Sequence, residues 1–177
     1  MLYGLARLFS LISLIFVGGC IQSSYDIALD VPIELPKLEG IFVKSGTNDV
    51  VVIKPMRAGY QFQWGGGESN FLRLFKIPEF SGYVVQVYDY SLDSANNKKP
   101  KFSYFLAQAS DDGFSFSVTT VDFDHIPANL KARVNVSVSK NYMEPKDPSQ
   151  TLDIIREAAK LRQVPPIGYR RANSPPG

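Results

Sequence analysis

The chain has 177 residues and a formal net charge of +2 at pH 7, with 19 Lys and Arg against 17 Asp and Glu. This near balance, without a basic stripe or a block of like charge, argues against binding to nucleic acid or electrostatic binding to a membrane surface. A single cysteine excludes an internal disulfide framework. The fold must therefore depend on its hydrophobic core.

The first 19 residues have the order of a secretory signal. The basic residue Arg7 is followed by residues 8–17, all apolar or serine, and then by the small pair Gly18-Gly19. Ten helical residues rise about 15 Å, against a hydrocarbon core about 30 Å thick. We therefore expect residues 1–19 to be removed, which leaves 158 of the 177 residues, about one domain.

The run Val17-Gly18-Gly19-Cys20 resembles the lipobox of bacterial lipoproteins, and the resemblance covers the first 20 residues. It implies cleavage between Gly19 and Cys20, a diacylglyceryl group on the Cys20 thiol, and acylation of the new amino terminus. Lipidation also explains the odd cysteine, which would otherwise be a reactive thiol in an oxidising compartment. An ordinary secretory signal with an incidental cysteine and an uncleaved anchor are the alternatives.

Two or three acyl chains would hold the protein on a membrane, because each buried CH₂ contributes about 0.8 kcal/mol. By the same resemblance, Ile21 after the cysteine, in place of Asp, favours the outer membrane over the inner membrane. We therefore expect a protein of the cell envelope that faces the periplasm. Its membrane contact would be made through the N-terminal acyl groups.

The segment that follows Cys20 is expected to be a lipidated tether and lead-in strand, residues 20–39. Apolar side chains alternate with other residues from Ile27 to Leu35, while Pro32 and Pro36 lack the backbone N–H that a sheet needs. This pattern is typical of an edge strand or of a strap that lies over a core. Residues 40–162 are expected to form a β domain with a C-terminal helix, and residues 163–177 a Pro-rich tail.

In residues 40–139 the dominant period is two, and turn residues recur every eight to twelve positions. This is typical of an antiparallel meander that forms a barrel or a sandwich. We therefore predict a mainly β domain of about eight strands. The expected strands are Ile41–Lys44, Val50–Lys54, Tyr60–Trp64, Phe71–Ile77, Tyr83–Tyr90, Phe102–Ala109, Phe114–Thr120 and Val134–Ser139.

Three of these strands, residues 71–77, 83–90 and 102–109, carry large apolar groups on both faces, so a further element must cover one face. Asp147, Pro148 and Gln150 are suited to the N-cap, first turn and third position of a helix. The apolar stripe that follows predicts a helix to Arg162 that packs on the sheet or plugs one end of a barrel.

Residues that could carry chemistry are few. His125 is the only histidine and lies close to Asp122 and Asp124, which would suit a hydrolase or a divalent metal site. Metal sites usually draw ligands from several elements, and no second His or free Cys exists to complete one. A loop histidine beside a capping Asp is the simpler interpretation, so we expect no enzyme, no cofactor and no metal.

Aromatic residues are abundant, with 12 Phe and 9 Tyr, and most are expected in the core. A tyrosine hydroxyl on an apolar ring also suits the rim of a ligand pocket. The candidates for such a pocket are Tyr83, Tyr88, Tyr90 and Tyr104. Gly40-Ile41-Phe42 is similar to the Gly-x-Trp opening of lipocalins, with Phe42 in place of Trp, and eight strands followed by a helix fit that fold.

As a whole, the chain is similar to small proteobacterial lipoproteins of unknown function, with a lipobox, a β domain, a late helix and a short tail. We expect a non-catalytic, lipid-anchored domain that binds or assembles with another envelope protein. A lipocalin-like carrier of an apolar small molecule is the alternative. A site around Asp122, Asp124 and His125 is a third hypothesis.

Overall fold

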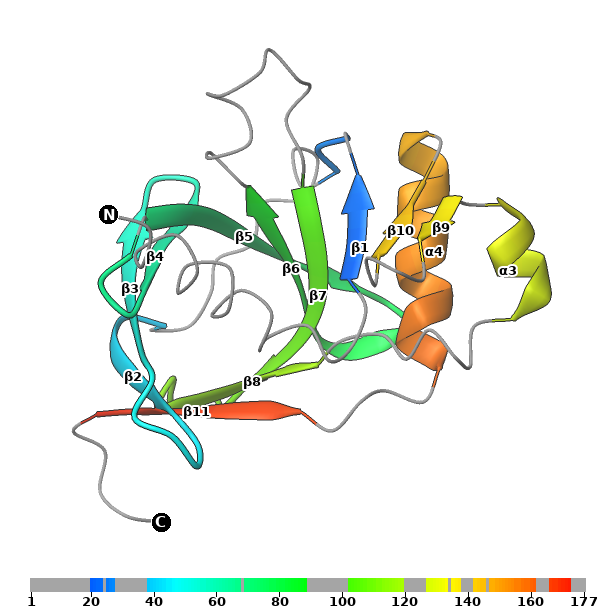
Figure 1. The fold of residues 1–177 in the computed structure, drawn as a ribbon. Helices are drawn as coiled ribbons and strands as arrows, with labels where there is room; N and C mark the ends of the chain where they lie inside the picture. The colour runs from blue at the N-terminus through cyan, green and yellow to red at the C-terminus, as the bar shows by residue number, and fades with distance from the viewer. Residues whose placement is uncertain are drawn as a thin grey trace, which may run out of the picture.

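Eight antiparallel strands close into a barrel in the computed structural model of the chain (Figure 1). They are β2 (Gly40–Lys44), β3 (Val50–Met56), β4 (Gly59–Trp64), β5 (Ser69–Ile77), β6 (Phe80–Tyr88), β7 (Phe102–Ala109), β8 (Ser115–Thr119) and β11 (Ile167–Arg171). Strand β11 pairs with β8 and with β2, and so joins the two ends of the meander. The predicted mainly β, antiparallel fold is confirmed, and the form it takes is the barrel. The structure describes residues 20–23, 25–27, 38–67, 69–88, 102–119, 127–133, 135–137, 142–145, 147–161 and 166–172.

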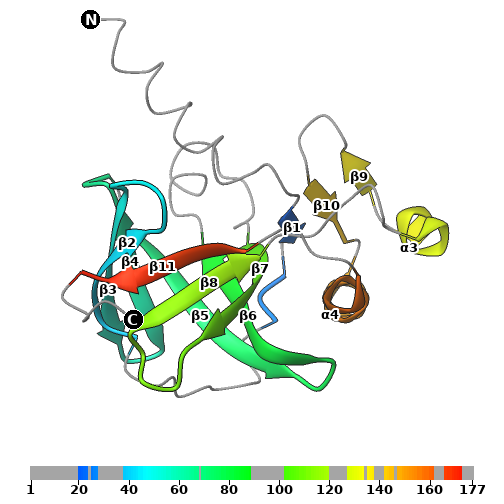
Figure 2. The same cartoon turned by 90° about the horizontal axis from the view of Figure 1, so that it is seen from below.

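One edge of β7 pairs with two different strands, so the sheet branches there. On the edge away from β6, the second half of β7 pairs with β8, while its first half pairs with β1 (Cys20–Ser23). The other edge of β1 pairs with β10 (Tyr142–Glu144) in parallel orientation. Strand β10 in turn pairs with β9 (Asn135–Ser137). This three-stranded extension and the short helix α3 (Ala128–Arg133) lie outside the barrel, on one side of it (Figure 2).

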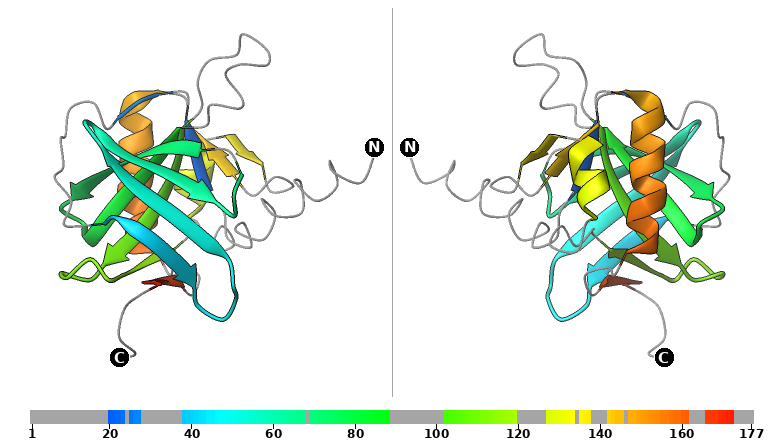
Figure 3. Two further views of the ribbon diagram at one scale, coloured as in Figure 1. Left: turned by 90° about the vertical axis from the view of Figure 1, so that its left-hand side faces the viewer. Right: turned by 90° about the vertical axis from the view of Figure 1, so that its right-hand side faces the viewer.

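Helix α4 (Pro148–Lys160) covers the outer face of the wall at β1, β6 and β7 (Figure 3). Its first turn is built as predicted, since the Asp147 side chain accepts a hydrogen bond of 2.8 Å from the Gln150 backbone N–H and Pro148 stands in the first turn. The helix packs on the sheet, which was one of the two expected positions. It ends two residues before the expected Arg162.

Two apolar cores result, one on each side of the wall. The core inside the barrel contains Leu38, Phe42, Val51, Ile53, Tyr60, Leu72, Leu74, Val85, Ala107 and Tyr169. The outer core lies beneath α4 and contains Ile21, Phe75, Ile77, Val84, Phe102, Tyr104, Leu106, Ile154, Ile155 and Ala158. Strands β5, β6 and β7 contribute to both cores, as expected from their apolar residues on both faces.

The structure corrects the expected tail at residues 163–177, because β11 is a full member of the barrel. Its inward-facing Tyr169 is 3% exposed, and both edges of the strand are hydrogen-bonded. The five residues of β11 are too short a run to show a period from the sequence alone. The pairing partners β2 and β8 are distant in sequence, so long-range contacts decide the conformation here.

Three further expectations differ from the structure. Residues 20–23 were assigned to a tether and instead form β1 within the sheet. The expected strand Val134–Ser139 is represented by the three residues of β9, after a helix, α3, that the sequence analysis does not predict. Phe114 was expected as the first residue of the strand Phe114–Thr120, but it precedes β8 and is 42% exposed.

Candidate functional site

Of the four tyrosines proposed as one pocket, the three that the structure describes do not lie on one face of the barrel wall. Tyr83 packs against the interior core, and the ammonium of the exposed Lys76 lies 5.1 Å from its ring centroid. Tyr88 and Tyr104 lie on the outer face, in or against the core under α4. Tyr83 and Tyr88 are five positions apart in one strand, an odd spacing that places them on opposite faces. Tyr90 lies outside the described residues.

The other candidate sites are placed only in part. Cys20 is the first residue of β1, opposite Tyr142 of β10, while Gly19 lies outside the described residues. Asp122, Asp124 and His125 also lie outside them, so their hypothesis stays a prediction. Among the described residues, no cluster of three His, Cys, Asp or Glu side chains is arranged to hold a metal ion. The same part of the chain contains no helix with the length and apolarity to span a membrane.

The best-defined site in the described structure binds the residues that follow Cys20. We call residues 20–23 and 25–27 the N-terminal strap. Ile21 is 2% exposed in the outer core and is paired with Tyr104 of β7 on one edge and Met143 of β10 on the other. Both edges of β1 are therefore occupied, and the apolar side chain between them is buried. Ile27, at the end of the described strap, packs against the same core.

A chain of hydrogen bonds connects the strap to α4. The Tyr25 backbone N–H donates to the Ser23 hydroxyl at 3.0 Å, and the Ser23 and Thr151 hydroxyls are 3.0 Å apart. The Thr151 hydroxyl donates to the Asp147 carbonyl oxygen at 3.1 Å, so the Ser23 hydroxyl is the donor to Thr151. Ser23 and Thr151 are 1% and 0% exposed. Each buried hydroxyl in this chain thus both donates and accepts, which avoids the cost of an unsatisfied polar group.

A polar row on the outer face of the barrel binds the rest of the strap. Arg73 of β5, Gln86 of β6 and Tyr104 of β7 are cross-strand neighbours in register. The Asp26 carboxylate accepts hydrogen bonds from the Arg73 guanidinium at 2.9 Å and from the Gln86 amide at 2.7 Å. The Tyr104 hydroxyl donates to the Tyr25 carbonyl oxygen at 2.7 Å. The strap therefore crosses three strands of the barrel wall.

The Tyr104 phenol is held in its neutral, donating form. Its side chain is almost fully buried, and this burial raises its pKa well above the usual range for tyrosine. The neighbouring Asp26 carboxylate acts in the same direction, although more weakly than burial. The hydrogen bond to the strap therefore persists across the physiological pH range.

The sequence analysis missed most of this site. Tyr104 was singled out, but as the rim of a ligand pocket rather than as the binding partner of the strap. Two signals were present: Gln86 is a polar residue within the apolar run of β6, and Thr151 lies at helical spacing with Ile154, Ile155 and Ala158. A polar side chain on an apolar face is buried only with a partner. The identity of that partner depends on long-range folding.

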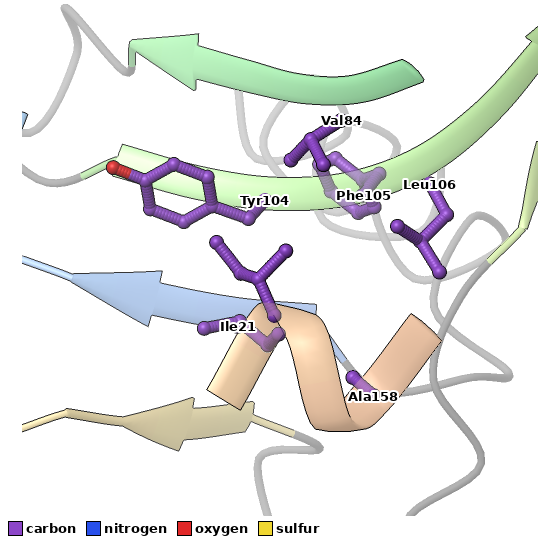
Figure 4. A pocket seen from close by; sticks show the side chains of 7 residues that line it. Ile21, Val84, Tyr104, Phe105, Leu106 and Ala158 are labelled. Atoms are coloured by element: carbon purple, nitrogen blue, oxygen red, sulfur yellow. The ribbon is translucent and has the colours of Figure 1, made fainter. Parts of the chain in front are cut away.

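A small void lies between β1, β7 and α4 (Figure 4). Its volume is about 10 Å³, at the lower limit of what one water molecule needs. The lining residues are Ile21, Val84, Tyr104, Phe105, Leu106, Ile155 and Ala158. The void is thus a packing defect of the outer core rather than a ligand site.

The barrel interior is aromatic. Tyr169 stacks on Phe116 with ring centroids 4.6 Å apart and meets Trp64 edge-on at 5.7 Å. Burial raises the pKa of Tyr169, so its phenol also stays neutral. A second group of interior side chains packs against the buried core but remains partly exposed. These are Phe62, Trp64, Tyr83, Val87, Phe105, Phe116, Val118 and Ile167.

No protein family model matches the chain, and no curated protein or solved structure matches it. The similarities of its N-terminus to a lipobox and of residues 40–42 to the lipocalin opening remain predictions from the sequence.

The hydrogen bond between Ser23 and Thr151 can be tested by a double-mutant cycle. We expect Thr151→Val, which keeps the shape of the side chain, to lower the free energy of unfolding by about 1–3 kcal/mol, since it leaves the buried Ser23 hydroxyl without an acceptor. Ser23→Ala alone should also destabilise. The double variant should lose clearly less than the sum of the single variants, because they remove the same interaction. Urea unfolding measures all four proteins, and strict additivity would contradict the contact.

Proposed function

We propose that this protein is an envelope lipoprotein, acylated at Cys20, that presents a non-catalytic β-barrel on the periplasmic face of a membrane, with the outer membrane favoured. The main support is the sequence pattern Val17-Gly18-Gly19-Cys20. The structure is compatible with it, since Ile21, the second residue after the predicted cut, is buried in the outer core. Signal removal at this position leaves every strap contact intact.

The barrel is proposed to act by binding another component of the envelope. Two exposed apolar side chains, Ile41 at 50% and Phe114 at 42%, support this proposal. They flank the end of β11, since the Arg171 N–H donates to the Phe114 carbonyl and the Ala172 N–H to the Ile41 carbonyl, each at 2.8 Å. Phe114 lies on the same side of the wall as the interior residue Phe42, since the Arg171 guanidinium lies over both rings. Ile41 points to the outer face, so each side chain is a separate candidate contact.

Acylation is tested by metabolic labelling with a radioactive or clickable fatty acid. We expect label on the wild-type protein and its complete loss in Cys20→Ser, together with a shift of the protein out of the membrane fraction. Gln22→Ala, a change in the same strand that leaves the thiol in place, is the matched control and should keep the label. Label retained by Cys20→Ser would refute the anchor.

Binding to an envelope component is tested by chemical crosslinking in intact cells, followed by purification of the barrel. Ile41→Ser should reduce the yield of a crosslinked partner, whereas Asn48→Ser, an exposed change at the β2–β3 turn, should leave it unchanged. Equal yields from both variants would exclude Ile41 as the contact.

A carrier of an apolar small molecule is the second candidate. An eight-stranded barrel has an interior that side chains just fill or that holds one small ligand. The partly exposed interior aromatics, Trp64 and Phe62 among them, favour the second case. Trp64 is the only tryptophan of the chain, so its emission reports on the interior alone.

For this candidate, a brominated fatty acid should quench Trp64 emission in a saturable way, and unbrominated stearate should reverse the quenching. The control protein carries Trp64→Phe and Ile41→Trp, which move the fluorophore to an exposed position on the outside of β2. Saturable quenching of both proteins would indicate surface adsorption. Absence of quenching in the wild type would remove the carrier hypothesis.

A further inference from the structure

The strap leaves no linker between Cys20 and the barrel. Consecutive Cα atoms are about 3.8 Å apart, and the residue next to Cys20 is already buried in the outer core. The expected tether and lead-in strand of residues 20–39 could have extended by at most about 70 Å, and by less where part of it docks. A lipid attached at Cys20 would therefore be held next to the barrel wall.

We infer that the acylated N-terminus is clamped to the barrel wall, so that the protein meets the lipid headgroups with one fixed side, the side of β1 and the C-terminal end of α4. This inference rests on the proposed acylation of Cys20. It names the surface that faces the membrane and requires that the domain does not swing on a flexible tether.

The course of α4 shows which residues lie at the level of Cys20. Ser23 at the end of β1 contacts Thr151 in the first turns of the helix, whereas Ile21 lines a void with Ile155 and Ala158 further along it. Helix and strand therefore run in opposite directions. The last turn of α4, with the exposed Glu157, lies toward the start of β1.

The opposite end of the helix lies away from Cys20. Ser149 is exposed in the first turn of α4, near Ser23 at the far end of β1. A domain clamped at the start of β1 would hold this first turn away from the bilayer, while a domain on a free tether would bring both ends of α4 to the bilayer equally often.

The attachment of the strap to the barrel wall, which we call the clamp, is made by many separate contacts. It comprises the two paired edges of β1, the buried Ile21 side chain, the hydroxyl chain to Thr151, and the bonds of Asp26 to Arg73 and Gln86. The hydrogen bonds and the burial of the Ile21 side chain each stabilise the attached strap. Release of the strap breaks all of these contacts together.

Energy transfer from the protein to the membrane tests the clamp. The full-length acylated protein is placed in phosphatidylcholine vesicles that contain a headgroup-labelled acceptor lipid. Because acylation blocks the Cys20 thiol, a donor dye can be attached at Glu157→Cys in one variant and at Ser149→Cys in another. We expect transfer from Glu157→Cys to exceed that from Ser149→Cys by about twofold, since the two positions are about 12 Å apart along the helix axis.

The matched control carries about ten Gly and Ser residues inserted between Cys20 and Ile21. Such an insert adds a root-mean-square reach of about 17 Å and leaves every contact from Ile21 onward in place. The difference between the two dye positions should then be lost, while the urea midpoint stays unchanged. Equal transfer from both positions in the protein without the insert would overturn the clamp.

Mass spectrometry of the same samples separates the two claims. An acyl mass on Cys20 together with equal transfer from both dye positions overturns the fixed orientation and leaves the lipoprotein proposal standing. Absence of an acyl mass overturns the lipoprotein proposal and the orientation with it. An acyl mass together with unequal transfer supports both.

Discussion

The apolar outer face of β5, β6 and β7 is the constraint on which the rest of the structure depends. These strands carry Phe75, Val84 and Leu106 outward, away from a barrel interior that is already apolar. Exposure of such side chains would cost about 1.5–3 kcal/mol each. Helix α4 covers part of this face, and the N-terminal strap covers the part next to it. The barrel is thus stabilised from outside by two elements that are distant in sequence.

The polar contacts of the strap fix its position on the apolar face. Apolar packing alone is non-directional, whereas the Asp26 carboxylate between Arg73 and Gln86 and the Tyr104 hydroxyl on the Tyr25 carbonyl define one register. Ser23 and Thr151 join the strap to the helix in the same way. These buried groups are satisfied together, so the loss of one partner affects the whole chain of contacts.

Much of the fold could be predicted from the sequence, because most barrel strands show a clear period of two and α4 has a complete N-cap. The pattern of apolar residues on both faces of β5 to β7 also predicted a covering helix. The conformations of β1 and β11 could not be predicted, since each is short and is stabilised by strands far away in the chain. The site was missed for the same reason: Gln86 and Thr151 stand out as polar residues on apolar faces, but the sequence does not show that Asp26 and Ser23 are their partners.

These features define a barrel whose proposed membrane anchor belongs to the folded domain. The central claim is that the N-terminal strap, residues 20–23 and 25–27, is part of the stable structure, and hydrogen exchange of the full-length acylated protein tests it most directly. Peptides that contain Ile21 to Ile27 should exchange as slowly as peptides from β7, to which β1 is paired. Exchange of this segment at the rate of an unstructured peptide, with β7 still protected, would contradict the account.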